Sequence, residues 1–417
     1  MHNPFSNKFF TRNRQKLKGH LDDDSLVLLF SNHRMPRNGD QYFPFRQNSD
    51  LFYLSGIEQE NTILLIEKGK DYLFIDEPDS RTSLWEGDRL QSDEAENISG
   101  IDNIQWTSDF EKTLGKLMHS KKKLYFNVHE KLNTGGVKSK DEMHLERLRR
   151  DYPFHSFLSL EPIISELRLR KEPEEIDAIK KAIDITGKTL ERVLKRIQPG
   201  ISEKEVEAEI NHDFILQGAN GLAFEAIVAS GRNATVLHYT KNSGICRDRE
   251  LLLLDFGAEY RNYAADITRT FPVNGRFSSR QRECYQAVLE VMKTVQKDIQ
   301  PGITIRELND KVIEKLTEKH IQLGLYKKDD LKDKENPVWK KFFPHGVSHF
   351  IGIDVHDYGN KNVILDKGMV ISWEPGIYIP EENMGIRIED DILVDTPAVN
   401  LSSGIPKEIE ELEERMQ

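Results

Sequence analysis

The sequence has little cysteine: Cys246 and Cys284 are too few for the disulfide framework of a small secreted protein or for a zinc cluster held by thiolates. It also lacks any run of about 18 consecutive apolar residues, so it predicts no membrane-spanning helix. The N-terminus carries positive charge without the apolar core of a signal peptide. We therefore expect a soluble protein of the reducing cytoplasm, with no membrane partner.

Basic residues are in the minority, with 59 Lys and Arg against 70 Asp and Glu and a formal net charge of -11. An acidic protein repels a phosphate backbone, so nucleic acid is not an expected partner. The 417 residues, 37% of them hydrophobic, are enough for two packed domains and are unlike the composition of a disordered chain. Peptides or small molecules are the partners that this composition favours.

Short apolar runs alternate with polar turns and helical stretches between residues 21 and 130. The runs expected to form strands are SLVLLF, NTILLIE, DYLFID and KLYFNV. This pattern predicts an α/β domain over residues 1–165. Pro162 and Pro173 bracket a charged stretch before a new helix, and we place the domain boundary there, with a second domain over residues 170–417.

The second domain contains an internal repeat. Residues 195–210, KRIQPGISEKEVEAEI, resemble residues 297–312, KDIQPGITIRELNDKV. In each copy a helix precedes the QPGI turn and a capping box begins the next helix, as Ser202 with Glu205 and Thr304 with Glu307. A chance match of one turn motif is the alternative, but agreement over helix, turn and cap favours two similar halves.

Two acids lie inside apolar strand sequence in the run LLLLDFGAEYRNYAADITRTFPV. A polar turn near Arg261 and Asn262 would fold this run into a hairpin that brings Asp255 and Asp266 together. Burying one carboxylate is costly, and burying two side by side costs more unless a cation compensates them. A single acid near a strand end is more often a cap or a turn residue, but the pair favours a metal site.

A second group of candidate ligands follows in the last hundred residues. The segment PHGVSHFIGIDVHD contains His345, His349 and His356, and strand-like segments after it contain Glu374 and Glu389. A lone histidine is more often a core or surface residue than a ligand. Three histidines within twelve positions, followed by two acids in strand sequence, indicate a functional cluster.

The charges of the candidate ligands predict how many metal ions they hold. Four carboxylates and one neutral imidazole balance two divalent cations and leave a bridging hydroxide as the extra negative charge. Mostly oxygen donors with one nitrogen suit manganese, cobalt, iron or zinc and argue against a copper thiolate site. We expect two divalent ions, manganese foremost, although the residues themselves do not choose among these metals.

At these residues the sequence resembles the pita-bread metallopeptidases, a family that includes methionine aminopeptidase, prolidase and aminopeptidase P. The resemblance covers residues 170–400 and implies an α+β pita-bread (creatinase/aminopeptidase) fold with an internal pseudo-two-fold duplication. Two N-terminal segments, RNGDQYFPFRQNSDLFYLSGIEQENTILLI and TSLWEGDRL, resemble the N-terminal domain of aminopeptidase P and its prolidase relatives. This resemblance implies cleavage of the bond between an N-terminal residue and proline in proline-containing peptides.

The resemblance also implies roles for the candidate ligands. Asp255 would bind one metal ion in bidentate fashion, Asp266 would bridge both ions, and Glu389 would form a second bridge. His349 and Glu374 would complete the other metal site. In the family a hydroxide that bridges the ions attacks the scissile carbonyl, and the glutamate matching Glu374 transfers the proton as general base and then as general acid.

Other residues match family positions around the substrate. His356 would donate to the carbonyl oxygen or to the tetrahedral intermediate, and His238 matches a histidine near the substrate. His345 and Arg387 match positions that line the proline side of the pocket, and Tyr378 is a weaker match. These residues are the expected substrate-binding set, with His238 and His356 also expected to be catalytic.

Two of the implied roles have structural alternatives. Arg387 could instead form a salt bridge with Glu389 or Asp390. Trp85 matches a tryptophan that reaches a neighbouring subunit's active site in aminopeptidase P, but it could equally be a plain core residue. The family leads us to expect a homodimer or a dimer of dimers.

Three other functions remain open from the sequence. An Xaa-Pro dipeptidase (prolidase) has the same ligands and chemistry but accepts only dipeptides. A creatinase-like hydrolase works without metal, and the complete ligand set argues against it. A pita-bread module used as a peptide-binding scaffold would have lost its ligands, and this chain retains all five.

Overall fold

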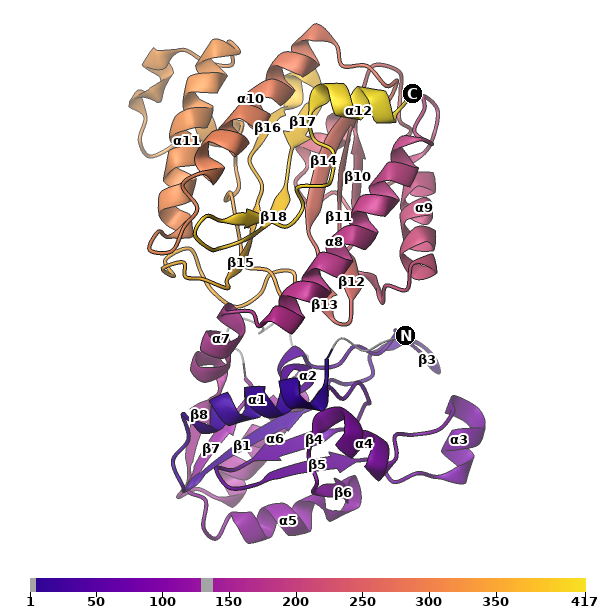
Figure 1. Ribbon diagram of the computed structural model, residues 1–417, viewed down its shortest axis with the longest axis vertical. Coiled ribbons are helices and arrows are strands. Elements are labelled where there is room, and N and C mark those ends of the chain that lie inside the picture. The colour runs from indigo at the N-terminus through magenta and orange to yellow at the C-terminus, as the bar shows by residue number, and fades with distance from the viewer. Residues whose placement is uncertain (1–4, 129–137) are drawn as a thin grey trace. The chain divides into compact units, whose positions relative to one another are not determined.

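The computed structural model describes residues 5–128 and 138–417 (Figure 1). The chain divides into two compact units, Met1–Arg168 and Leu169–Gln417. Within the described ranges, no helix is long and apolar enough to cross a membrane.

The first unit is a mixed sheet with helices on both faces (Figure 1). Its helices are α1 (Asn7–Lys18), α2 (Ser49–Ser55), α3 (Ser80–Glu86), α4 (Ser92–Ser99), α5 (Phe110–Leu117) and α6 (Lys140–Asp151), with α7 (Glu161–Leu169) at its end. Its strands are β1 (Ser25–Phe30), β2 (Pro36–Asn38), β3 (Gln41–Tyr42), β4 (Ile63–Ile66), β5 (Asp71–Ile75), β6 (Ile104–Trp106), β7 (Lys123–Phe126) and β8 (Ser156–Ser159). Each of the four apolar runs expected to be a strand forms one.

Six of these strands form one sheet in the order β6-β5-β4-β1-β7-β8. The central strand β1 pairs antiparallel with β4 and parallel with β7, and all six of its residues are buried. Alternate side chains of a strand point to opposite faces, and Leu26, Leu28 and Phe30 pack into one core with residues of α5 and α6. A strand buried on both faces reads as a continuous apolar run, as SLVLLF does.

The second unit has helices outside a set of short, curved sheets (Figure 1). Its helices are α8 (Pro173–Leu194), α9 (Glu203–Leu216), α10 (Ser279–Gln296), α11 (Ile305–Gln322) and α12 (Ile409–Arg415). Its strands are β9 (Gly221–Leu222), β10 (Ile227–Ser230), β11 (Leu251–Phe256), β12 (Ala258–Tyr260), β13 (Tyr263–Ala264), β14 (Ile267–Pro272), β15 (Val370–Trp373), β16 (Gly376–Ile379), β17 (Met384–Arg387), β18 (Asp390–Leu393) and β19 (Val399–Asn400). The sheets are β10-β11-β14, β13-β12-β9, β15-β18-β19 and β16-β17.

The repeated QPGI sequence is also repeated in structure. Gly200 and Gly302 each have a φ of 99°, a conformation that favours glycine. Each is also joined by a hydrogen bond to a later segment of its own half. The backbone N–H of Gly200 donates to the carbonyl of Cys246, and that of Gly302 donates to the carbonyl of Leu365, both at 2.8 Å. Both expected capping boxes are present. The two halves therefore share the same local fold.

The predicted hairpin between Asp255 and Asp266 is present but bent. β11 pairs with β14, with Asp255 opposite Thr268, and the chain turns at Arg261 and Asn262, which both have positive φ. The tip of the hairpin, β12 and β13, belongs to a different sheet. At the bend, a Cβ on Gly257 would lie 1.7 Å from the carbonyl oxygen of Ala265, so only glycine fits there.

Candidate metal centre and active site

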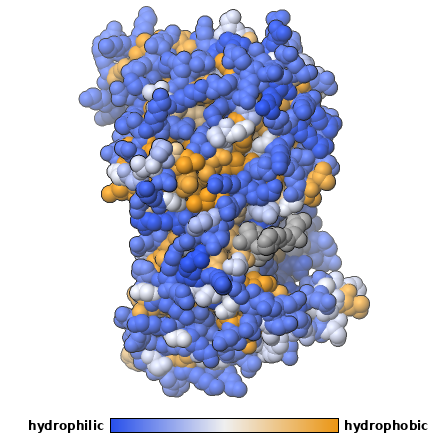
Figure 2. Space-filling view, in the orientation of Figure 1, coloured by the Kyte–Doolittle hydropathy of each residue, from blue (hydrophilic) through white to orange (hydrophobic). Residues whose placement is uncertain are grey.

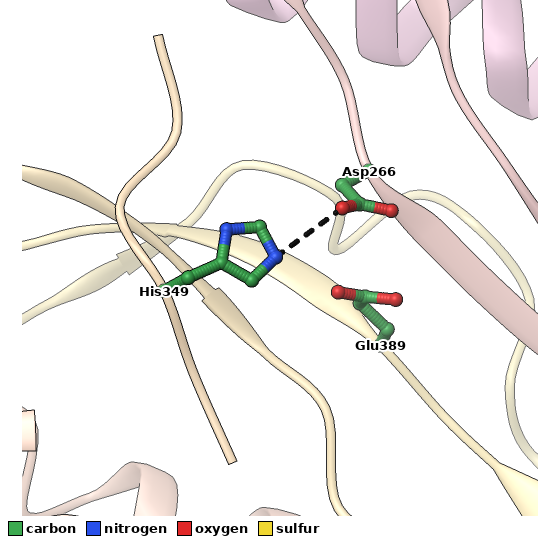
Figure 3. Close-up of side chains that lie close together, drawn as sticks. All are labelled: Asp266, His349 and Glu389. Atoms are coloured by element: carbon green, nitrogen blue, oxygen red, sulfur yellow. Dashed lines mark ion pairs between the residues drawn. The ribbon is translucent and has the colours of Figure 1, made fainter. Parts of the chain in front are cut away.

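Three residues from separate segments form a group that could hold a metal ion. One ligand atom from each of Asp266, His349 and Glu389 lies within 4.8 Å of the others. Asp266 directly precedes β14, Glu389 lies between β17 and β18, and His349 comes from a loop (Figure 3). His349 Nε2 points to the acids and lies 3.4 Å from Asp266 Oδ2. The two halves of the second unit therefore meet at this group.

Glu374 and Asp255 lie beside this group. Glu374 Oε1 is 3.7 Å from His349 Nε2, and it accepts a hydrogen bond from Ser372 Oγ at 3.2 Å. Asp255 lines the same cavity, but its Oδ2 accepts a hydrogen bond from Arg387 Nη2. Asp255 Oδ1 accepts no hydrogen bond from the described residues and can face a cation, and Oδ2 keeps a second lone pair, so bidentate binding by Asp255 stays a prediction.

The electrostatics of the site favour a cation strongly. Burial, and then the charge of Glu389, raises the pKa of Asp266 well above its ordinary value. Burial and the neighbouring Glu374 act in the same way on the pKa of Glu389, and burial raises the pKa of Glu374 to about 7. Without a cation these acids repel one another in a poorly solvated site, and a divalent ion would remove that repulsion.

The hydrogen-bond pattern also fits a metal. Glu389 Oε1 and Asp255 Oδ1 are buried without a hydrogen-bond partner among the described residues. His349 Nδ1 lies 3.1 Å from the carbonyl oxygen of Phe350, so Nδ1 carries the proton and Nε2 presents a lone pair to the acids. Burial lowers the pKa of His349 to about 4, which keeps the ring neutral at pH 7. The five residues therefore suit oxygen-rich binding of divalent ions.

Residues that the sequence did not single out form hydrogen bonds with two of the candidate ligands, Asp266 and Glu389. Asp391 Oδ2 accepts the backbone N–H of Asp266 at 3.2 Å, and Thr268 Oγ1 donates to Glu389 Oε2 at 2.6 Å. The fully buried Arg269 donates to the backbone carbonyl of Glu389. The only sequence signal for Asp391 and Arg269 is a charge within apolar strand sequence.

Arg387 joins the metal group to the substrate residues. Its Nη1 donates to Tyr378 Oη at 2.8 Å, and Tyr378 Oη lies 2.8 Å from His345 Nε2. The alternative of a salt bridge between Arg387 and Glu389 or Asp390 is wrong. Its ion pair is with Asp255, whereas Asp390 pairs with Arg269. A buried guanidinium is planar and rigid, so it fixes Asp255 and Tyr378 in one geometry.

A cavity of about 520 Å³ opens in front of these groups. The candidate residues that line it are Asp255, Asp266, His349, Glu374, Glu389, His238, His345, His356 and Arg387. Apolar side chains complete the lining, with Phe224, Ile227, Leu237 and Val355 among them. Tyr378 is 2% exposed and lies behind His345. The second unit therefore brings together every site residue expected within it.

Trp85 belongs to the first unit, and the alternative of a core tryptophan is wrong. Its side chain is 79% exposed and that of Leu84 is 81% exposed, and α3 contains no buried residue. Figure 2 shows hydrophobic side chains on the surface around α3. Large apolar side chains grouped on a surface are typical of an interaction site.

A buried ion pair supports the loop that carries His356. Lys171 Nζ lies 3.0 Å from Asp357 Oδ2, and both side chains are 1% exposed. Asp357 also accepts the backbone N–H of Tyr358, and its own N–H donates to the carbonyl of Phe350. The pair therefore fixes the loop between His349 and His356 from its buried side.

Replacing Lys171 by Met is expected to lower the free energy of unfolding by about 3–5 kcal/mol, because Asp357 is then left as a buried charge without its cation. Chemical denaturation, followed through the unfolding transition of the second unit, measures this loss of free energy. Lys188 pairs with Asp184 on the surface, and its side chain is 60% exposed, so Lys188→Met is the matched control. A loss equal to that of Lys188→Met would contradict the assignment.

The sequence matches two family models. Residues 177–396 match metallopeptidase family M24, and residues 10–125 match the aminopeptidase P N-terminal domain. Xaa-Pro aminopeptidase of Escherichia coli is 35% identical over 99% of this chain and 98% of the relative. Xaa-Pro aminopeptidase of Haemophilus influenzae is 36% identical over 98% of this chain and 96% of the relative.

Solved structures agree with these matches. Zinc-substituted aminopeptidase P of E. coli in complex with product has a TM-score of 0.91 at 33% identity, over 99% of this chain and 98% of that one. The same enzyme with the inhibitor Pro-Leu has a TM-score of 0.90 at 34% identity and the same coverage. The fold class expected from the sequence is confirmed. The chain belongs to metallopeptidase family M24 and, within it, to the Xaa-Pro aminopeptidases.

Proposed function

We propose that the protein hydrolyses the peptide bond between an N-terminal residue and a following proline, with two divalent metal ions, manganese foremost. The observation that carries this proposal is the convergence of Asp266, His349 and Glu389 in one cavity, within a chain that matches Xaa-Pro aminopeptidases along nearly its whole length. We assign Asp255, Asp266, His349, Glu374 and Glu389 as the metal ligands. When bound, the ions would polarise the scissile carbonyl and activate a water molecule.

Glu374 is suited to proton transfer. Burial raises its pKa to about 7 in the absence of an ion, and a bound cation would lower that pKa and leave the carboxylate charged, as a general base requires. Ser372 Oγ holds its Oε1, and Oε2 lies 3.8 Å from His345 Nδ1. Glu374 would therefore take a proton from the attacking water and deliver it to the leaving proline nitrogen.

We assign two histidines, His356 and His238, to the substrate. The rings of His349 and His356 lie 4.4 Å apart between centroids, so His356 borders the metal group. Burial lowers the pKa of His356, which leaves a neutral ring with one N–H to donate to the carbonyl oxygen or to the oxyanion that follows. His238 lines the same cavity, and we assign it to the substrate.

The cavity also suits proline. A proline after the scissile bond has no N–H and a fixed φ, so its site needs shape and apolar surface more than hydrogen bonds. The proline side would include His345, Arg387 and Tyr378, which are joined by hydrogen bonds into one rigid group. Rigid walls of this kind recognise a ring better than a flexible side chain.

Faster cleavage of an Xaa-Pro-Yaa tripeptide than of an Xaa-Pro dipeptide or an Xaa-Ala-Yaa tripeptide is the expected result. We expect a ratio of kcat/KM of at least ~10, which corresponds to about 1.4 kcal/mol of transition-state binding. The assay measures release of the first residue with added Mn²⁺. Cleavage of the dipeptide alone would make the protein a prolidase. A scaffold would cleave none of them and would contain no stoichiometric metal.

We further propose that the enzyme works on peptides in the cytoplasm, as a homodimer or a dimer of dimers. Cys246 and Cys284 are buried, free thiols, which suits a reducing compartment. The exposed Trp85 and Leu84 on α3 support an interface, because apolar side chains of this size are stabilised by a partner. We assign Trp85 to contact with substrate across such an interface.

A further inference from the structure

A buried carboxylate outside the metal group organises one wall of the cavity. Glu203, the first residue of α9, is 0% exposed. Its carboxylate accepts five hydrogen bonds of 2.6–2.9 Å, from Ser230 N, Ser230 Oγ, Asn233 Nδ2, Tyr239 Oη and Gly244 N. Every one of these donors lies in residues 230–244, the loop that carries His238. The carboxylate therefore connects the two ends of this loop, at Ser230 and Gly244, with its middle, at Asn233 and Tyr239.

The internal duplication supplies a comparison within the same chain. Ser202 and Thr304 are the equivalent caps, so the position after each cap holds Glu203 in one half and Ile305 in the other. Ile305 is also buried, at 4% exposure. The first turn of the helix therefore folds around an apolar side chain equally well. The carboxylate of Glu203 serves the loop rather than the helix.

Tyr239 is the link between this carboxylate and His238. Its hydroxyl donates to Glu203 Oε2 at 2.9 Å and accepts from Asn233 Nδ2 at 3.0 Å and from the backbone N–H of Ser243 at 3.1 Å. These three bonds use the full capacity of a tyrosine hydroxyl. The orientation of Tyr239 is therefore fixed at both the ring and the hydroxyl.

The residues on both sides of His238 are anchored. Leu237 and Tyr239 pack against a buried cluster that consists of Ile227, Ala229, Ala234, Leu253 and Tyr378. His238 between them is exposed and lines the cavity. Because both neighbours pack against this cluster, the backbone at His238 is held on either side, and the imidazole lines the cavity.

We propose that Glu203 and Tyr239 are positioning residues that hold His238 at the substrate. This inference rests on the proposed function of the cavity. Neither residue lines the cavity, so both act through the loop. A catalytic group misplaced by about 1 Å can lose 100-fold in rate, so a fixed loop has a direct effect on turnover.

The test is a double-mutant cycle between Tyr239→Phe and His238→Ala. In the otherwise unchanged protein, Tyr239→Phe should lower kcat by about tenfold and change KM by less than about twofold, since the lost alignment acts in the transition state. In the His238→Ala background the same change should cost less than about twofold. An equal loss in both backgrounds, or no loss in either, would overturn the proposal.

Tyr72→Phe is the matched control. Tyr72 Oη donates to Glu67 Oε1 at 3.1 Å in the first unit, so this variant removes the same kind of bond far along the chain from the site. We expect it to leave kcat unchanged. Calorimetric titration with Mn²⁺ and with the product dipeptide Pro-Leu should give the same affinities for Tyr239→Phe and the unchanged protein, within about twofold. A tenfold loss of Mn²⁺ affinity would assign Tyr239 to the metal group instead.

A second measurement tests the proposal without turnover. The imidazole NMR signal of His238 is identified by its disappearance in His238→Ala. Tyr239→Phe and Glu203→Gln should both shift that signal, and Tyr72→Phe should not. If the unchanged protein cleaves no peptide, the proposed function fails, but the signal still reports the loop. An unshifted His238 signal in both loop variants would overturn the positioning role by itself.

Discussion

Asp266→Ala is expected to lower kcat/KM for an Xaa-Pro-Yaa tripeptide by at least ~1000-fold, about 4 kcal/mol of transition-state stabilisation, while the fold survives. One ligand atom from each of Asp266, His349 and Glu389 lies within 4.8 Å of the others. The loss of Asp266 would leave the proposed metal group without the acid that we expect to bridge the two ions. Retained activity in this variant, or in Glu389→Ala, would contradict the assignment of two metal ions.

In the metal-free protein, Asp266→Ala is expected to leave the stability unchanged or to raise it, although it lowers activity. Asp266 is a buried acid whose pKa is raised by burial and by four neighbouring carboxyl groups, so its removal relieves repulsion. We expect metal-free Asp266→Ala to unfold at the same or a higher temperature than the unchanged metal-free protein. Asp298→Ala removes a half-exposed acid paired with Lys311 and is the control, with less than about 0.5 kcal/mol of change expected.

Removal of divalent ions with a chelator is expected to destabilise the protein, and more at pH 8 than at pH 5.5. Glu374 has a folded pKa of about 7, raised by burial, and the pKa of Asp266 and of Glu389 is also raised. A carboxyl with a raised folded pKa contributes stability at low pH and loses it as the pH rises through that folded pKa. Each group still titrating costs up to about 1.4 kcal/mol per pH unit.

Thermal unfolding with a chelator and with Mn²⁺ at both pH values measures this effect. Added Mn²⁺ should raise the melting temperature by more at pH 8, because the ions bind the deprotonated acids. Activity should be lost on chelation and return with Mn²⁺. A melting temperature that does not respond to Mn²⁺ at either pH would argue that these residues hold no metal.

The sequence predicts correctly those features that depend on residues close together in the chain. Each of the four apolar runs becomes a strand of the first unit, and in β1, which is buried on both faces, the continuous apolar run is itself the signal. Asp255 and Asp266 could be brought together because a hairpin pairs residues at fixed offsets. The capping boxes at Ser202 and Thr304 depend on residues three positions apart, so they too are visible in the sequence.

Long-range partners could not be predicted in this way. Arg387 pairs with Asp255, 132 positions away, rather than with the acids beside it. Glu203 follows a helix cap, where an acid is ordinarily an exposed residue that favours the helix dipole, yet it is buried under a loop. Trp85 is exposed although tryptophan is often buried. In each case the tertiary neighbours decide the outcome.

The duplication in the second unit has a consequence for the direction of the substrate. A peptide chain has a polarity, from amino to carboxyl end, whereas a site with perfect two-fold symmetry would accept a peptide in both directions equally. Two linked halves of one chain can change independently, as Glu203 and Ile305 have at equivalent positions. A nearly symmetric fold can therefore distinguish the two ends of a peptide, because its two halves carry different side chains at equivalent positions.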